Sequence, residues 1–175
     1  FNWIKEHVTT EKKINIFCGL GNNGGDGLAL GKMLANSNYQ VIINIIRYSE
    51  KTSDDFQINY NRLTGISGIT IVDIKETNEL QNIEPEDVVI DAIFGSGLTK
   101  PVKGVIGEIV RFINETKSIT IAIDMPSGLF ADKSSIIEKG EIIQAGLTVL
   151  LLTSVPILVI LILSRDKSIS VWLIF

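Results

Sequence analysis

The chain has 175 residues, a length that fits one domain of ordinary size. Hydrophobic residues make up 45%, charged residues 21%, and the formal net charge is −4, which excludes a disordered chain and argues against a nucleic-acid-binding protein with a basic face. The single cysteine excludes an intramolecular disulfide and favours a reducing compartment. Because the chain has only one cysteine and one histidine, a zinc site built from this chain alone is also excluded.

Short apolar runs alternate with helical patterns along the first 146 residues. Residues 1–5 resemble the end of a helix. Near-continuous β-branched runs are typical of strands covered on both faces, and strands alternating with helices predict a parallel sheet. The sequence therefore predicts an α/β fold, a three-layer α/β/α sandwich with a Rossmann-like, mostly parallel sheet. The predicted elements are strands over residues 14–18, 41–46, 69–72, 88–93 and 119–123, and helices over 28–35, 105–113 and from a Ser53 cap through 63.

The tail of the chain, residues 147–175, is atypically apolar for such a domain. Its charges are confined to Arg165, Asp166 and Lys167, and Pro156 lies in the middle of an uncharged run over 147–163. We favour two buried strands with a turn near Pro156. The alternatives are a membrane-spanning segment, for which the run is near the lower length limit, and a sequence that departs from a functional domain through error or decay. We expect a single domain over 1–175 that includes this tail.

A glycine- and asparagine-rich segment, CGLGNNGGDG at residues 18–27, follows the first predicted strand. It contains the GxGxxG spacing of dinucleotide-binding turns. We predict a loop whose glycines allow positive φ and a close approach to a ligand, followed by a helix N-terminus that binds an anion such as pyrophosphate. The alternative is a plain turn between strand and helix. In nicotinamide dehydrogenases an acidic residue that binds the ribose is expected near the end of the second strand, where this chain has Arg47 and Ser49. Glu50 lies slightly beyond that position, which weakens the interpretation of the chain as a nicotinamide dehydrogenase.

Two further glycine-rich segments follow strands that end in an aspartate. Asp91 precedes IFGSGLTKPVKG at 93–104, and Asp124 precedes MPSG at 125–128. A carboxylate at the end of an apolar strand must be paired, hydrogen-bonded or bound to a cation. We predict that both carboxylates approach one pocket, where a cation near Asp91 would leave Asp124 free as an acid or base. Lys100 and Lys103 are candidates to bind phosphates. The alternatives are turn-stabilising roles for the aspartates and a solvent-exposed role for the lysines.

In order and spacing, three segments resemble the NAD(P)H-hydrate epimerase family, the YjeF N-terminal domain: CGLGNNGGDGL at 18–28, VVIDAIFGSGLTKPVKG at 88–104 and AIDMPSGL at 122–129. The resemblance covers roughly residues 1–150. It implies an isomerase of nicotinamide cofactor repair, which interconverts the R and S forms of hydrated NADH and NADPH (NADHX and NADPHX). It also implies a homodimer. It further implies a dehydratase, as a partner or a fused domain, that acts on the S form and restores the cofactor.

The same resemblance assigns roles to individual residues. It places Asp124 at the reacting end of the substrate, and we hypothesise that Asp124 gives and takes the proton. It implies one potassium ion per subunit, bound by Asn23, Asp91 and Ser127. The substrate contacts that it implies are Asn22, Asn23, Gly24, Gly25, Asp26, Gly95, Ser96, Gly97, Leu98, Thr99, Lys100, Pro101 and Asp124.

The chain departs from the family pattern at both ends. A leading segment with a helix, which in relatives helps to form the pocket wall and the dimer contact, is missing, and the family's Pro-Lys pair is matched only by Pro156 followed by Ile157. Two alternatives stay open. One is a non-catalytic nucleotide-binding or dimerisation module of the same fold, as in an RNA-decapping scaffold protein. The other is an NAD-dependent oxidoreductase, which rests on the GxGxxG spacing alone. Without a leader in the sequence we expect a cytoplasmic protein, with no nucleic-acid partner and no membrane partner.

Overall fold

The structure, a computed structural model, describes residues 1–130, 140–150, 158–163 and 169–174; side chains are described for 1–130 and 140–149. One sheet has the strand order β3-β2-β1-β4-β5-β6-β7-β8. Strands β1 to β6 pair in parallel, whereas β7 pairs antiparallel with β6 and β8 with β7. The strands are β1 (Lys13–Cys18), β2 (Gln40–Ile46), β3 (Ile69–Ile74), β4 (Val88–Ala92), β5 (Ile119–Ile123), β6 (Leu147–Leu150), β7 (Leu158–Leu163) and β8 (Ile169–Ile174).

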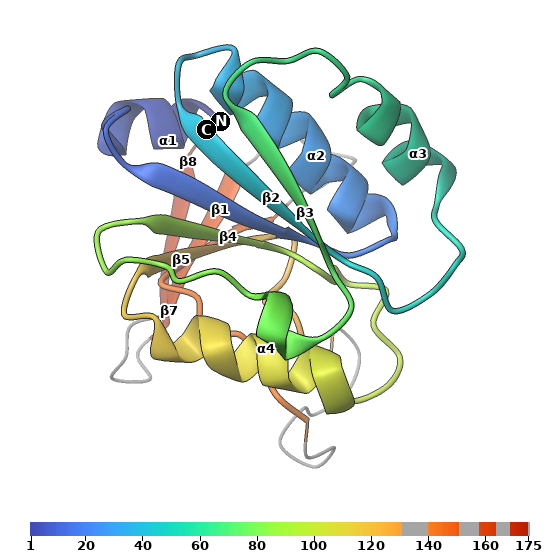
Figure 1. The fold of residues 1–175 in the computed structure, drawn as a ribbon. Coiled ribbons are helices and arrows are strands. Elements are labelled where there is room, and N and C mark those ends of the chain that lie inside the picture. The colour runs from blue at the N-terminus through green and yellow to red at the C-terminus, as the bar shows by residue number, and fades with distance from the viewer. Residues whose placement is uncertain (131–139, 151–157, 164–168, 175) are drawn as a thin grey trace.

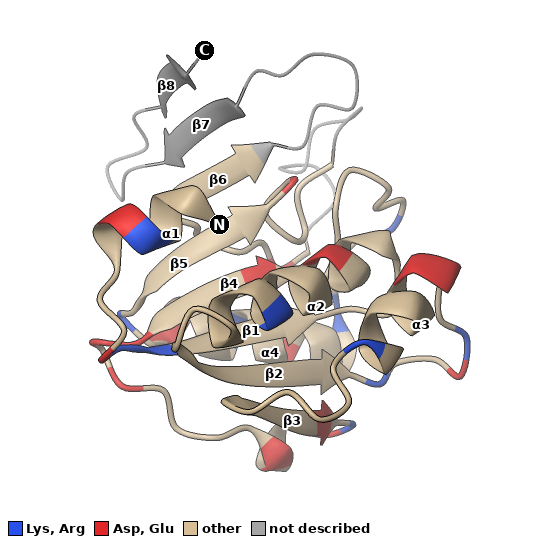
Figure 2. Cartoon of the chain, turned by 90° about the horizontal axis from the view of Figure 1, so that it is seen from above, with Lys and Arg blue, Asp and Glu red and all other residues tan. Residues whose placement is uncertain are grey.

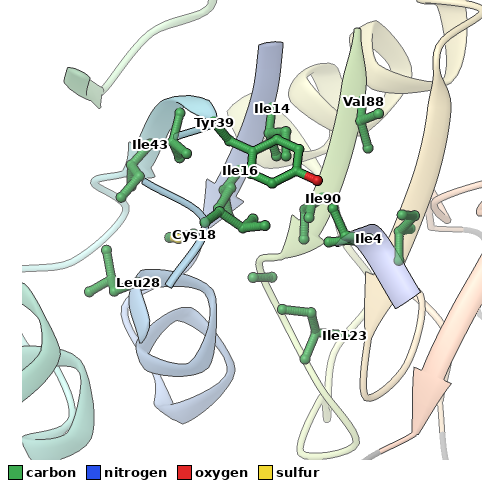
Figure 3. Close-up of a cluster of buried hydrophobic side chains, with 14 of the residues drawn as sticks. Ile4, Ile14, Ile16, Cys18, Leu28, Tyr39, Ile43, Val88, Ile90 and Ile123 are labelled. Atoms are coloured by element: carbon green, nitrogen blue, oxygen red, sulfur yellow. The ribbon is translucent and has the colours of Figure 1, made fainter. Parts of the chain in front are cut away.

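Helices cover both faces of the sheet, which confirms the predicted three-layer sandwich (Figure 1). Helices α1 (Asn2–His7), α2 (Asn22–Ala35) and α3 (Asp54–Asn61) lie on one face and α4 (Gly104–Glu115) on the other, while η1 (Thr77–Glu79) is a single 3-10 turn. Each face has its own core. One cluster joins β1 and β4 to Leu28 of α2 (Figure 3), and the other joins the sheet to Val110 of α4. Burial of this aliphatic surface is the main force that holds the layers together.

The predicted strands and helices agree with the structure within two residues at most ends. The tail forms three strands, β6, β7 and β8, one more than predicted. The predicted turn near Pro156 lies outside the described residues. Within the part of the chain that the structure describes, no helix is long and apolar enough to cross a membrane.

Helix α2 is the exception, because it begins at Asn22 and not at residue 28. Residues 22–27 of the predicted loop are therefore the first turns of the helix, and none of the glycines over 18–27 has a positive φ. They are needed for close packing. A Cβ on Gly24 would overlap the carbonyl of Gly19, and one on Gly27 would lie 2.6 Å from the Cβ of Ala92 in β4. Side chains at these positions would push α2 off the sheet.

Candidate functional site

The loops that follow the carboxyl ends of β1, β2, β4 and β5 line a single cavity of about 1020 Å³. Ligands of open parallel sheets bind at this edge because the loops there converge. The charged residues lie mostly on loops and outer helical turns, while the central strands are largely uncharged (Figure 2). The residues that line the cavity are Gly21, Asn22, Asn23, Asp26, Tyr48, Asp124, Ile106 and the whole segment 93–103.

Most of the predicted substrate contacts meet in this cavity. Asn22, Asn23 and Asp26 come from α2, and Asp124 and the segment 95–101 complete the group. Gly24 and Gly25 do not line it. Gly24 packs on Gly19, and a Cβ on Gly25 would lie 3.0 Å from the backbone of α3, so both are needed where helices and loops pack closely.

Asp124 presents its carboxylate to the cavity from a constrained backbone. Its φ of 64° lies in the left-handed region, which is rare for residues other than glycine but tolerated by aspartate. The N–H of Asp124 donates to the carbonyl of Val149 at 2.7 Å, and its Oδ2 accepts the N–H of Ser96 at 2.6 Å. A Cβ on Gly95 would overlap this Oδ2. The loop after β4 thus fixes the position of the carboxylate through backbone groups alone.

Asp26 is the second carboxylate of the cavity. It lies on α2, and the pKa of its carboxyl is raised, first by burial of part of its surface and then by the negative charges of Asp55 and Asp124. The negative charge of Asp124 therefore disfavours ionisation of Asp26.

Asp91 does not line the cavity, which differs from the prediction that it shares a pocket with Asp124. It is completely buried. Its carboxylate accepts the N–H of Ser127 at 2.7 Å, the hydroxyl of Ser127 at 2.6 Å and the N–H of Ile93 at 3.2 Å. Burial raises the pKa of Asp91 to about 6, and these hydrogen bonds oppose that rise. Asp91 ties the loop after β4 to the loop after β5.

The cavity also has features that attract an anion. Gly21 is the N-cap of α2, no acidic residue lies in the first turn, and Asn22 and Asn23 bring the N-terminal end of the helix to the cavity wall. A helix N-terminus carries a partial positive charge and unpaired N–H groups. Lys100 and Lys103 line the same cavity and take part in neither of the ion pairs found among the described residues.

Sequence reasoning missed Tyr48, which lines the cavity two residues after the end of β2. Its hydroxyl accepts the N–H of Leu20 at 3.1 Å, and its ring lies 5.6 Å from that of Phe94. The available signal was its position, because every loop that follows a parallel strand reaches this edge of the sheet.

Comparisons with known proteins identify the family of the chain. The family model of the YjeF-related protein N-terminus matches residues 1–155. The chain belongs to this family. The crystal structure of the yeast protein ynu0 has the same fold, with a TM-score of 0.70 at 22% sequence identity, covering 84% of this chain and 63% of that one.

Relatives of this YjeF-related domain carry names of cofactor repair enzymes. An NAD(P)H-hydrate epimerase of Oenococcus oeni is 36% identical over 138 residues, 79% of this chain and 62% of the relative. One of Anaerococcus prevotii is 33% identical over 83% of this chain and 68% of its own length. A bifunctional NAD(P)H-hydrate repair enzyme Nnr of Thermofilum pendens is 34% identical over 77% of this chain. The matched part spans only 26% of that longer relative.

The residues predicted to bind potassium in this YjeF-related domain include an unusual amide. Both polar side-chain atoms of Asn23 are buried without a hydrogen-bond partner in the structure. A buried amide oxygen without a partner is unfavourable unless a ligand meets it, and oxygen-binding cations accept amide and carboxylate oxygens. Asp91 and Ser127 are in direct contact. The amide of Asn23 and the Asp91–Ser127 pair therefore have the donor chemistry of an oxygen-bound cation. No cluster of three or more His, Cys, Asp or Glu that could hold a metal is found among the described residues.

Proposed function

We propose that this protein is an NAD(P)H-hydrate epimerase, which interconverts the R and S forms of hydrated NADH and NADPH. The proposal rests on the Asp124 carboxylate, which Ser96 holds at 2.6 Å in a cavity that also attracts an anion. It is supported by the family and by relatives that are named for this activity.

The reaction requires a group that gives and takes a proton. Carbon C6 of the hydrate is bonded to a hydroxyl and to the ring nitrogen, so its configuration changes by loss and return of the hydroxyl or by opening of the ring. In the first route Asp124 gives a proton to the hydroxyl, which leaves as water, and takes a proton back when water adds to the other face of C6. Acid–base help of this kind typically accelerates a reaction about 100- to 10,000-fold.

The diphosphate of the substrate would lie against the N-terminus of α2. Its negative charge suits the helix end, and Lys100 and Lys103 supply two further positive charges to the cavity. These groups bind and orient the substrate, so that C6 meets the fixed carboxylate of Asp124.

A potassium ion would be held by Asn23, Asp91 and Ser127. The unpaired amide oxygen of Asn23 and the buried carboxylate of Asp91 support this assignment. The bound ion would supply a positive charge that offsets Asp91 and would order the two loops that Asp91 joins.

The S form has a further use in the repair of the cofactor. We propose that a dehydratase, as a partner or as a fused domain, consumes it; the name of the Thermofilum relative describes that protein as bifunctional. The homodimer and the cytoplasmic location stay predictions.

The decisive test is conversion of purified R-NADHX, followed by chromatography. We expect conversion by the wild-type protein and a loss of at least 100-fold in kcat for Asp124→Asn, which keeps the shape of the side chain but removes its acid–base function. Asp54→Asn, the same change on α3 outside the cavity, is the matched control. An unchanged rate for Asp124→Asn would reject the role of Asp124, and no conversion by the wild type would reject the function.

A further inference from the structure

Tyr48 is an aromatic wall of the cavity that has no part in the proton transfer or in the phosphate contacts. It leaves 42% of its surface exposed although it lines the cavity. A large side chain of this kind offers an apolar face to a ligand.

A hydrogen bond and a ring contact fix the position of the Tyr48 ring. Its hydroxyl accepts the N–H of Leu20, and the carbonyl of Leu20 in turn accepts the N–H of Ser53 at 2.9 Å. The ring packs against Phe94 with the two planes inclined by 45°. Because the ring is already fixed, a ligand that stacks on it loses little entropy in ordering it.

The strand order gives the position of Tyr48 along the cavity. Asp124 follows β5 and Tyr48 follows β2, with β4 and β1 between these two strands. Three strand spacings separate them at the level of the sheet, roughly 14 Å. The N-terminus of α2, which follows β1, lies between the two ends. A dinucleotide that reacts at Asp124, with its diphosphate at α2, therefore extends its far end toward Tyr48.

The chemistry of the two rings in the substrate agrees with this direction. The hydrated nicotinamide has a tetrahedral C6 and is not planar, whereas adenine is a planar aromatic base that stacks well on tyrosine. We propose that Tyr48, supported by Phe94, stacks on the adenine of the substrate and forms the subsite for its adenosine end. This inference rests on the proposed epimerase function.

The test compares two substrates that differ by the AMP moiety. R-NADHX carries AMP, whereas the R form of hydrated reduced nicotinamide mononucleotide lacks it and keeps a single phosphate. We expect Tyr48→Leu to raise the KM for R-NADHX about tenfold or more, as for the loss of one base–aromatic contact, and to leave the KM for the mononucleotide within about twofold of the wild type. Tyr48→Phe keeps the ring and loses only the bond to Leu20, so its difference from Tyr48→Leu measures the ring alone. Tyr60→Leu removes a tyrosine of α3 that does not line the cavity and serves as the matched control.

The outcomes test the adenine subsite and the epimerase function separately. If the wild type converts both substrates and Tyr48→Leu affects neither, or affects both equally, the adenine subsite is rejected and the function stands. If the wild type converts no hydrate, calorimetry with ADP-ribose decides. Binding that Tyr48→Leu weakens about tenfold and Tyr60→Leu does not would support the subsite, while equal or absent binding would reject it.

Discussion

At the scale of single residues, the site depends on one glycine next to the proposed acid–base group. Gly95→Ala would place a methyl group on the Oδ2 of Asp124, so the carboxylate must turn away from the N–H of Ser96. We predict a loss of about 100-fold in kcat, because a misplacement of about 1 Å has this effect in enzymes. The KM should change little. Steady-state kinetics with R-NADHX measures both values.

The matched control for this change lies in the same loop. Gly97→Ala adds the same methyl group where no atom lies within 4 Å, so its loss in kcat should be at least tenfold smaller. Similar losses in the two variants would show that the loop as a whole, and not the contact with Asp124, determines the rate.

Tyr48 is a cavity residue that could not be predicted from the sequence. Asp124 and the lysines are predictable because charged residues next to glycines in an apolar sequence are conspicuous. Tyr48 lies after β2, where the dinucleotide-binding pattern predicts only an acidic residue, and its contacts with Leu20 and Phe94 join segments far apart in the sequence. Such contacts depend on the packing of loops, which no local pattern describes.

At the scale of the elements, α3 is stabilised by a cap that was predicted from the sequence. The hydroxyl of Ser53 accepts the N–H of Phe56 at 3.1 Å. We predict that Ser53→Ala lowers the free energy of unfolding by about 1 kcal/mol, as for other caps. Chemical denaturation measures this. Ser49→Ala, which loses an exposed bond to Lys51, should stay within about 0.5 kcal/mol of the wild type. Equal effects of the two variants would contradict the capping role.

The elements that are determined by local patterns were predicted, and the start of α2 was not. The β-branched runs of β1 and β2 and the cap of α3 act over a few residues. Asn22 to Gly27 oppose a helix by their intrinsic propensity, since each glycine costs about 1 kcal/mol relative to alanine. The helix forms there because only glycines let α2 approach Gly19 and Ala92 so closely.

At the scale of the whole molecule, buried Asp91 makes stability depend on pH. Burial raises the pKa of Asp91 from its ordinary value of 3.8 to about 6, so the folded state binds this proton more tightly than the unfolded state. The contribution is fully present below pH 4 and is lost as pH rises through 6. We predict a decline of about 2 kcal/mol in the free energy of unfolding from this group between pH 4 and pH 7 without potassium.

The measurement is chemical denaturation over this range, with Asp91→Asn as the reference that lacks the titrating group. The difference between the two profiles isolates Asp91 from the other carboxyl groups. If potassium binds ionised Asp91, adding it should stabilise the wild type more at pH 7 than at pH 5. We expect the free energy of unfolding of the wild type to fall relative to that of Asp91→Asn as the pH rises. A wild type that gains stability relative to Asp91→Asn with rising pH would contradict the assignment.

The bonds of Asp91 also have a consequence for motion. The carboxylate holds Ile93 from one loop and Ser127 from the other, and the hydroxyl of Ser127 accepts the N–H of Phe94 at 2.9 Å. Neither loop can leave without breaking bonds of the other, so their local unfolding is one cooperative event. The amide protons of Phe94 and Ser127 would then exchange with deuterium together, at one common rate.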